Sequence, residues 1–307
     1  MKRLLILALA LGGCATGSEY TAETTHAKLV ARYPHIVVAG SALPDGVTAL
    51  PGLTYARPGG RALQLDLYLP AAAHSAAVPA VVLVHGGGWR SGTRANLAPM
   101  AVRLAQRGYA AATVSYRLSP EARYPAAADD VRVAVRWLRA HAARYGIAAD
   151  RIALGGASAG GQIASLVGVT GAGDGAVQAI VNIDGLSDFS SAAARLHEDD
   201  PAKKPSSAGA WFGGTYAEKT ALWHEASPLF YVNAGTPPVL FIGSAQARFA
   251  VGREEMVARL SANGVASQVV LLPDTPHSFW LFDPWLAPTV DAMDTFLNQH
   301  MGKGQAR

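Results

Sequence analysis

Apolar residues gather along this chain in short runs, and some of the stretches between them carry apolar residues at helical spacing. An unbroken apolar run of this length is typical of a parallel strand that is buried on both faces. Residues 80–85 form such a run, and further strands are expected at 110–116, 151–155, 178–185, 237–243 and 268–272. Val131, Val135 and Leu138 are spaced as on one face of an amphipathic helix, and a terminal helix is expected from about Ala287 to His300. The alternation predicts an α/β domain with a mostly parallel central sheet flanked by helices.

The residues before these runs show other patterns. Residues 53–57 and 62–69 flank Pro58-Gly59-Gly60, a hairpin turn signal, and the second arm alternates apolar with polar residues. The two arms therefore predict an antiparallel hairpin. Residues 14–50 show little periodicity and are expected to form a tether and N-terminal segment, with an added edge strand at residues 33–38.

The most informative turn follows the run at residues 151–155. It reads Gly156-x-Ser158-x-Gly160, and a helical pattern from Gln162 to Val167 comes next. A strand, a sharp turn and a helix are the context in which this motif forms a nucleophile elbow. Small neighbours let the strand and helix pass closely, so that the turn holds the Ser158 hydroxyl above the sheet. Ser158 is the candidate nucleophile; the alternative is a glycine-rich turn with an incidental serine.

A second glycine-rich loop, His85-Gly86-Gly87-Gly88-Trp89, ends the first buried run. It matches the HGGG-type motif of esterases, in which glycine lets the backbone approach the substrate and present its amides. The backbone amides of Gly87, Gly88 and Ala159 are the candidate donors to the oxyanion of a tetrahedral intermediate. The histidine of this loop is interpreted as a hydrogen-bonding residue that orients the loop, and the tryptophan as lining or shielding the site.

These motifs resemble a known family when they are taken together. The glycine loop, the serine elbow, the segment 116–121 and Asp129-Asp130-Val131 are similar to the hormone-sensitive-lipase/feruloyl-esterase-like (BD-FAE-like) branch of the α/β hydrolases. The resemblance covers about residues 51–300. It implies an α/β-hydrolase fold with a cap insertion at about 186–236. In this fold the base follows the last strand, which makes His277 the candidate base.

Two further inferences depend on the resemblance. Arg117, Glu121 and Asp130 lie outside the catalytic motifs and are interpreted as structural ion pairs. The segments 241–249 and 273–280 are also similar to a subgroup of carbohydrate acetylesterases that act on plant cell-wall polysaccharides. That similarity implies that Trp89, Arg248 and Trp280 border a sugar substrate.

The chain departs from the family pattern at the acid of the triad. Most relatives carry Gly-x-x-Asp after the penultimate strand, and this Asp orients the histidine, but here the position holds Gln246. An amide cannot stabilise an imidazolium as a carboxylate does, and losing that carboxylate costs about 10⁴ in rate in serine proteases. Asp184, at the end of the preceding strand, keeps the chain order of the triad and is the first candidate. Asp188 is second and Glu254 third, and Asp274 would need an unusual bend to reach a histidine three residues away.

Charge and composition exclude some functions. The formal charge is +4, 16% of the residues are charged, and they form no basic stripe, so nucleic acid is not an expected partner. No clustered His, Cys and Asp pattern suggests a metal site, and no cofactor is expected. Oligomeric state is not indicated.

The first residues read as an export signal. Lys2-Arg3 precedes a short apolar stretch, Leu4 to Leu11, and Leu11-Gly12-Gly13-Cys14 resembles the bacterial lipobox. Cys14 is the only cysteine of the chain. A lipoprotein-type signal peptide over residues 1–13 and lipidation of Cys14 are therefore expected, with location at the outer membrane or in the periplasm. The alternative is an ordinary secretory signal that is cleaved near Ala15.

The sequence thus predicts an exported, metal-independent serine esterase with an acyl-enzyme mechanism. The favoured substrates are acetylated plant polysaccharides or oligosaccharides. A general short-chain lipase or arylesterase and a feruloyl esterase are the alternatives within the same class. The alternative from another class is a non-catalytic, sugar-binding surface lipoprotein that has lost its acid.

Overall fold

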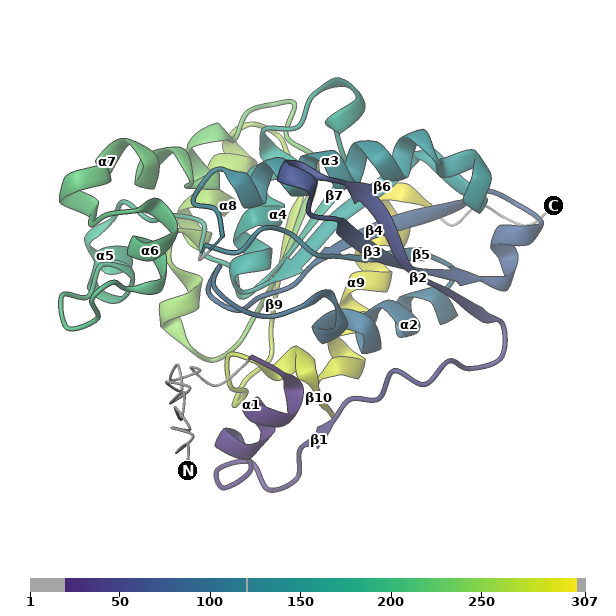
Figure 1. Ribbon diagram of the computed structural model, residues 1–307, viewed down its shortest axis with the longest axis horizontal. Coiled ribbons are helices and arrows are strands. Elements are labelled where there is room, and N and C mark those ends of the chain that lie inside the picture. Colours follow the sequence, from purple (N-terminus) through teal and green to yellow (C-terminus); the bar gives the residue numbers. More distant parts are fainter. Residues whose placement is uncertain (1–19, 120, 303–307) are drawn as a thin grey trace, which may run out of the picture.

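A mixed sheet of eight strands organises the molecule in the computed structural model, which describes residues 20–119 and 121–302 (Figure 1). The predicted signal peptide and Cys14 lie outside these residues. The strands lie in the order β2-β3-β5-β4-β6-β7-β8-β9. Their bounds are Val47–Ala56 (β2), Leu63–Pro70 (β3), Val78–Val84 (β4), Ala110–Val114 (β5), Ile147–Ala157 (β6), Ala179–Ile183 (β7), Val239–Gly243 (β8) and Ser267–Leu271 (β9).

The pairing of the strands follows the predicted patterns. β2 and β3 form the antiparallel hairpin, β3 pairs antiparallel with β5, and every pair from β5 to β9 is parallel. The unbroken apolar runs have a simple cause. In β4, Val82 and Val84 pack into the core on one face of the sheet, while Val81 and Leu83 pack into the core on the other. Both faces are buried, which explains why the strand shows no polar alternation.

Helices cover both faces of the sheet (Figure 1). The helices α3 (Ala126–Ala140), α4 (Ala159–Val169) and α8 (Arg253–Ala262) contribute to one apolar core. The helices α2 (Ala98–Gln106) and α9 (Leu286–Met301) contribute to the other. Within the part of the chain that the structure describes, no helix is both long and apolar enough to cross a membrane.

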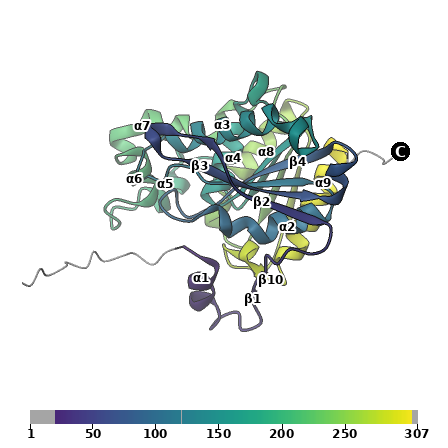
Figure 2. The same ribbon diagram turned by 45° about the vertical axis from the view of Figure 1, so that its right-hand side comes forward.

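The N-terminal segment differs from the expectation of a tether with an edge strand. Residues Ala22–Leu29 form the helix α1, whose first turn is closed by a capping box between Thr21 and Thr24. The expected edge strand reduces to β1 (Val37–Val38). It does not join the main sheet, because it pairs with β10 (Phe282–Asp283) in a separate two-stranded sheet. Figure 2 shows α1, β1 and β10 together on the side of α2.

The predicted cap insertion folds into three helices: α5 (Ala192–Glu198), α6 (Ser207–Phe212) and α7 (Tyr216–Glu225). They gather at one end of the molecule (Figure 1). Its aromatic residues form a continuous core: Trp211 stacks on Trp89 of the glycine loop with ring centroids 4.9 Å apart, and Phe189 packs edge-on against Trp223. Buried Gln162 of α4 adds a polar link, because its amide donates to the carbonyl of Ala226 at 2.8 Å. The cap is therefore packed firmly onto the domain.

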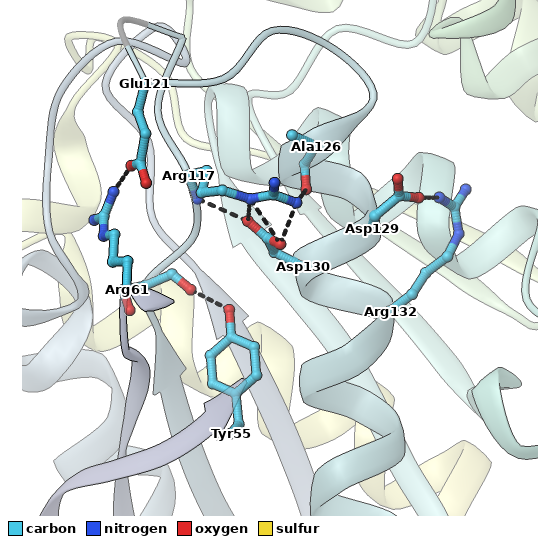
Figure 3. A network of polar contacts seen from close by, with 9 residues as sticks. Tyr55, Arg61, Arg117, Glu121, Ala126, Asp129, Asp130 and Arg132 are labelled. Atoms are coloured by element: carbon cyan, nitrogen blue, oxygen red, sulfur yellow. Dashed lines mark hydrogen bonds and ion pairs between the residues drawn. The ribbon is translucent and has the colours of Figure 1, made fainter. Parts of the chain in front are cut away.

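The predicted structural ion pairs are present at the start of α3 (Figure 3). The Asp130 carboxylate, which is 5% exposed, accepts hydrogen bonds from the Arg117 guanidinium at 2.8 Å and from its backbone amide at 2.9 Å. Hydrogen bonding to Asp130 raises the pKa of Arg117. Glu121 pairs with Arg61 of the β2–β3 hairpin. These contacts tie the loop after β5 to the hairpin and to α3.

Candidate active site

Ser158 occupies the turn between β6 and α4. Its backbone has φ 56° and ψ −124°, a strained combination for a residue with a side chain. Its amide is held by the carbonyl of Ile183 on the neighbouring strand β7 at 2.8 Å. A side chain at Gly160 would overlap the carbonyl oxygen of Val84, and one at Gly156 would overlap the carbonyl oxygen of Gly160. These two glycines therefore allow the close passage that lifts Ser158 above the sheet, as the motif predicts.

His277 lies in the loop after β9 and joins Ser158 to Asp184. Its Nε2 lies 2.8 Å from the Ser158 hydroxyl, and its Nδ1 lies 3.0 Å from Oδ2 of Asp184. Asp184 follows β7 directly and has φ 50°, and its other carboxylate oxygen accepts the backbone amide of Ser244 at 2.8 Å. Both carboxylate oxygens are therefore occupied. The arrangement has the geometry of a Ser-His-Asp triad.

The other candidate acids lie elsewhere. Asp188 accepts hydrogen bonds from the backbone amides two and three residues further along, which caps the turn into α5. Glu254 is 74% exposed and pairs with the arginine before it, and Asp274 is exposed. Gln246, at the position where most relatives carry the acid, is exposed too. Among the candidates, the structure brings Asp184 alone to the histidine.

The surroundings of His277 favour its neutral form. Burial lowers the pKa of His277, and this effect outweighs the hydrogen bond and the negative charge of Asp184, which raise it. The charge of Arg248 lowers this pKa further, and the charge of Glu198 raises it. A neutral imidazole whose Nε2 faces a hydroxyl can accept its proton, so the group is suited to act as a general base near neutral pH.

The glycine loop closes the other side of the serine. Gly88 and Ala159 line the same pocket as Ser158. Gly87 is not part of this lining; its carbonyl accepts the backbone amide of Ser91 at 3.1 Å, in a backbone conformation with φ 120°. Gly88 and Ala159 thus lie beside the hydroxyl. Donor roles for the backbone amides of Gly87, Gly88 and Ala159 stay predictions.

His85 behaves as a structural residue of this loop. Its ring is buried, stacks on Tyr116 with centroids 4.4 Å apart, and has Nδ1 at 2.8 Å from the carbonyl oxygen of Gly86. The Tyr116 hydroxyl donates to the His85 carbonyl at 2.9 Å. Burial lowers the pKa of His85 to about 4, so the ring is neutral at ordinary pH. These contacts fix the loop, in agreement with its interpretation as an orienting residue.

The pocket over the serine is small, with a volume of about 80 Å³. Its wall combines residues of the elbow, the glycine loop, the cap and the loop after β8. They are Gly88, Trp89, Ser158, Ala159, Asp184, Leu186, Glu198, Ser207, Arg248 and Phe249. The predicted contact residue Arg248 belongs to this wall, where its guanidinium pairs with Glu198 at 2.8 Å.

The two predicted tryptophan contacts differ in outcome. Trp89 lines the pocket, but the residue is 4% exposed and its indole N–H donates to the side-chain oxygen of Gln162 at 3.0 Å, so it mainly shields the site. Trp280 is 2% exposed and packs in the core of the α2–α9 face, edge-on to His277 at 5.1 Å. The structure therefore places Trp280 in the core and outside the lining of the pocket, and its contact with a sugar stays a prediction.

Four pocket residues were not among the predicted site residues: Leu186, Glu198, Ser207 and Phe249. Phe249 stacks on His277, Glu198 comes from the end of α5, and Ser207 begins α6. No periodic pattern or motif marks any of them, because each reaches the site through the fold of a loop or of the cap. Among the described residues, no group of His, Cys, Asp and Glu side chains is arranged to hold a metal ion.

The parallel sheet, the elbow and the serine–histidine–aspartate geometry together define an α/β hydrolase. The chain belongs to the BD-FAE family, whose model matches residues 65–249.

Three similar proteins illustrate this relationship. Esterase LipC of Mycobacterium tuberculosis is 30% identical over 256 residues, which cover 74% of this chain and 60% of that protein. The solved structure of a truncated carbohydrate esterase from gut microbiota has a TM-score of 0.69 at 21% identity and covers 83% of this chain and 97% of the other. Esterase Est2 of Thermogutta terrifontis has a TM-score of 0.68 at 22% identity, over 86% of this chain and 96% of the other. The chain spans 60–61% of the length of the curated relatives LipC and LipQ.

Proposed function

We propose that the protein is a serine hydrolase of carboxylic esters that works through an acyl-enzyme. The observation that carries the proposal is the continuous hydrogen-bonded chain from Asp184 through His277 to the Ser158 hydroxyl. Family membership supports it.

The geometry supports a two-stage reaction. The Ser158 oxygen attacks the ester carbonyl carbon while its proton passes to Nε2 of His277, and Asp184 stabilises the imidazolium that forms. The backbone amides of Gly87, Gly88 and Ala159 are the proposed donors to the negative charge on the carbonyl oxygen. The bond to the alcohol breaks as His277 returns the proton to the leaving oxygen. Water then attacks the acyl-serine in the same manner and releases the acid and free Ser158.

Turnover of p-nitrophenyl acetate tests this proposal. We expect hydrolysis by the wild-type protein and a loss of at least about 10³-fold in Ser158→Ala, which removes the nucleophile. Turnover that persists unchanged in Ser158→Ala, or none on any acyl ester, would sink the esterase function. The absence of turnover on any acyl ester would favour the non-catalytic sugar-binding alternative, which arises because Gln246 stands where most relatives carry the acid.

For the substrate, we propose acetyl groups on plant polysaccharides or oligosaccharides. A pocket of about 80 Å³ is well below the roughly 300–1,000 Å³ of sites that hold drug-sized ligands, so it suits an acetyl group better than a long acyl chain. The Arg248–Glu198 pair adds a polar edge able to contact sugar hydroxyls. Similarity to a carbohydrate esterase at 21% identity establishes the fold alone, so the pocket carries this argument.

Acetate release from acetylated xylan, xyloglucan or pectin fragments distinguishes this proposal from its alternatives. We expect faster acetate release from these glycans than hydrolysis of longer p-nitrophenyl acyl esters. A rate that rises with acyl length, together with intact acetylated glycans, would identify a general lipase or arylesterase. Preference for methyl ferulate would identify a feruloyl esterase.

We also propose that Cys14 carries a lipid anchor and that the protein works at the outer membrane or in the periplasm. The support is the lipobox-like Leu11-Gly12-Gly13-Cys14 after a short apolar stretch. Acyl chains on a cysteine hold a protein at a membrane without a spanning helix.

A further inference from the structure

The imidazole of His277 is enclosed by two aromatic rings. Phe249 lies face to face with it, with ring centroids 3.3 Å apart and an interplanar angle of 10°. Trp280 stands edge-on to it from the core, with centroids 5.1 Å apart and an angle of 88°. One face of the imidazole is therefore covered by a ring that nothing in the proposed chemistry uses.

Phe249 comes from the short helix η7 (Ala247–Ala250) in the loop after β8. This is the loop from which most relatives would supply the acid. At the beginning of this loop the backbone amide of Ser244 donates to Asp184, and near its end Phe249 stacks on His277. The loop does not supply the carboxylate; it contacts both Asp184 and His277, which are hydrogen-bonded to each other.

The cap holds this loop through an ion pair. The guanidinium of Arg248 lies 5.0 Å from the Phe249 ring centroid, a cation–π arrangement, and bonds to Glu198 at 2.8 Å. The Glu198 side chain, at the end of α5, is 6% exposed. A buried carboxylate needs a charged partner, so this pair fixes Arg248 and the adjacent phenylalanine relative to the cap.

We propose that Phe249 is a positioning residue for the catalytic imidazole, and that Glu198 of the cap holds it in place through Arg248. The kinetic consequence rests on the proposed esterase function, whereas the positioning itself does not. A stacked ring limits rotation of the imidazole out of the plane that joins Asp184 to Ser158, and it keeps water from that face. Misplacing a reacting group by about 1 Å can cost about 10²-fold in rate, so such restraint affects turnover.

The charged and titratable groups that face His277 are Asp184 after β7, Arg248 of η7 and Glu198 of α5. Burial lowers the pKa of His277 more than any of these charges changes it. Removing the aromatic cover admits water to the ring. The titration midpoint of His277 then rises toward its ordinary value, and a purely structural role of Phe249 would not produce this shift.

The experiment compares Phe249→Leu with Phe249→Tyr, which keeps the ring, and with a matched control. Phe230→Leu is that control, because Phe230 also packs on a histidine, His224, at 5.2 Å and lies beneath an arginine, Arg259, at 5.6 Å. It is 41% exposed and lies outside the pocket. The readouts are the NMR titration of His277 and kcat and KM on p-nitrophenyl acetate.

We expect Phe249→Leu to raise the titration midpoint of His277 and to lower kcat about 10-fold, with KM changed less than about 2-fold. Phe249→Tyr is expected to restore both values, and Phe230→Leu to leave them unchanged. A midpoint of His277 in Phe249→Leu equal to that in the wild type overturns the proposal, whatever the activity. The titration needs no turnover, so an inactive wild type would refute the esterase function without touching this result.

Discussion

Asp184 adopts a left-handed backbone conformation and also supplies the carboxylate that bonds to His277. Its backbone has φ 50°, uncommon for a residue other than glycine, and its carboxylate is 3% exposed and bonded through both oxygens. Aspartate tolerates this conformation better than most residues. The turn after β7 thereby directs the carboxylate toward His277 in the loop after β9. The acid thus follows β7, one strand before the position after β8 where most relatives carry it.

The pH dependence of activity follows from the state of His277. The base is active when neutral, so kcat/KM falls as the pH drops through the pKa of His277. Because burial lowers that pKa, we expect the acid limb of kcat/KM for p-nitrophenyl acetate to lie below pH 6.5, the ordinary histidine value. A limb centred at or above 6.5 would show that His277 is more hydrated than its position indicates.

Sequence reasoning succeeds at the site where a local rule fixes the residue. Ser158 is set by glycine spacing, and His277 by its place after the last strand. Asp184 emerges by elimination and by its position at the end of a strand. Phe249 and Trp280 show the limit, since whether an aromatic in a loop faces the pocket or the core depends on the path of the loop.

At the scale of elements, the buried strands are the most predictable part of the fold. Each is covered on both faces, so its sequence is apolar throughout and easily recognised. The apolar pattern does not predict helix α1, because none of its residues is buried and it lacks an apolar stripe. β1 has two residues and owes its conformation to distant β10, which no local pattern shows.

The pair Arg117–Asp130 gives a prediction about these elements (Figure 3). Asp130→Asn leaves the guanidinium without its charged partner, and we expect a loss of about 2–3 kcal/mol in the free energy of unfolding. Breaking a fully buried ion pair costs about 3–5 kcal/mol. The expected loss is at or below the low end of that range, because the Arg117 side chain remains 25% exposed. Urea denaturation measures the change.

The neighbouring pair offers the matched control. Asp129 is 54% exposed and bonds to Arg132 one turn along α3, so Asp129→Asn is expected to cost less than about 0.5 kcal/mol. Equal losses in the two variants would contradict the structural role of Asp130.

At the scale of the whole molecule, the cap and the sheet form one body around the site. The aromatic core of the cap is continuous with the core on the α3–α4 face, and the catalytic pocket takes its wall from both. The chain therefore builds a small site from segments as distant in sequence as residues 88 and 249.

The lipid anchor also belongs to this scale. In a bacterial host, we expect the wild-type protein in the membrane fraction and Cys14→Ser in the soluble fraction, because the substitution removes the thiol that would carry the acyl chains. Mass spectrometry of the mature N-terminus identifies the modification. An unmodified N-terminus beginning near Ala15 would instead establish an ordinary secretory signal.

The most direct test of the account is the turnover of Asp184→Asn on p-nitrophenyl acetate, with Glu254→Gln as the exposed control. With an unchanged circular dichroism spectrum, we expect kcat to fall by about 10³–10⁴-fold, because His277 loses its orienting partner and counter-charge. Glu254→Gln should stay within about 2-fold of the wild type. Near-normal turnover of a folded Asp184→Asn would contradict the triad of Ser158, His277 and Asp184.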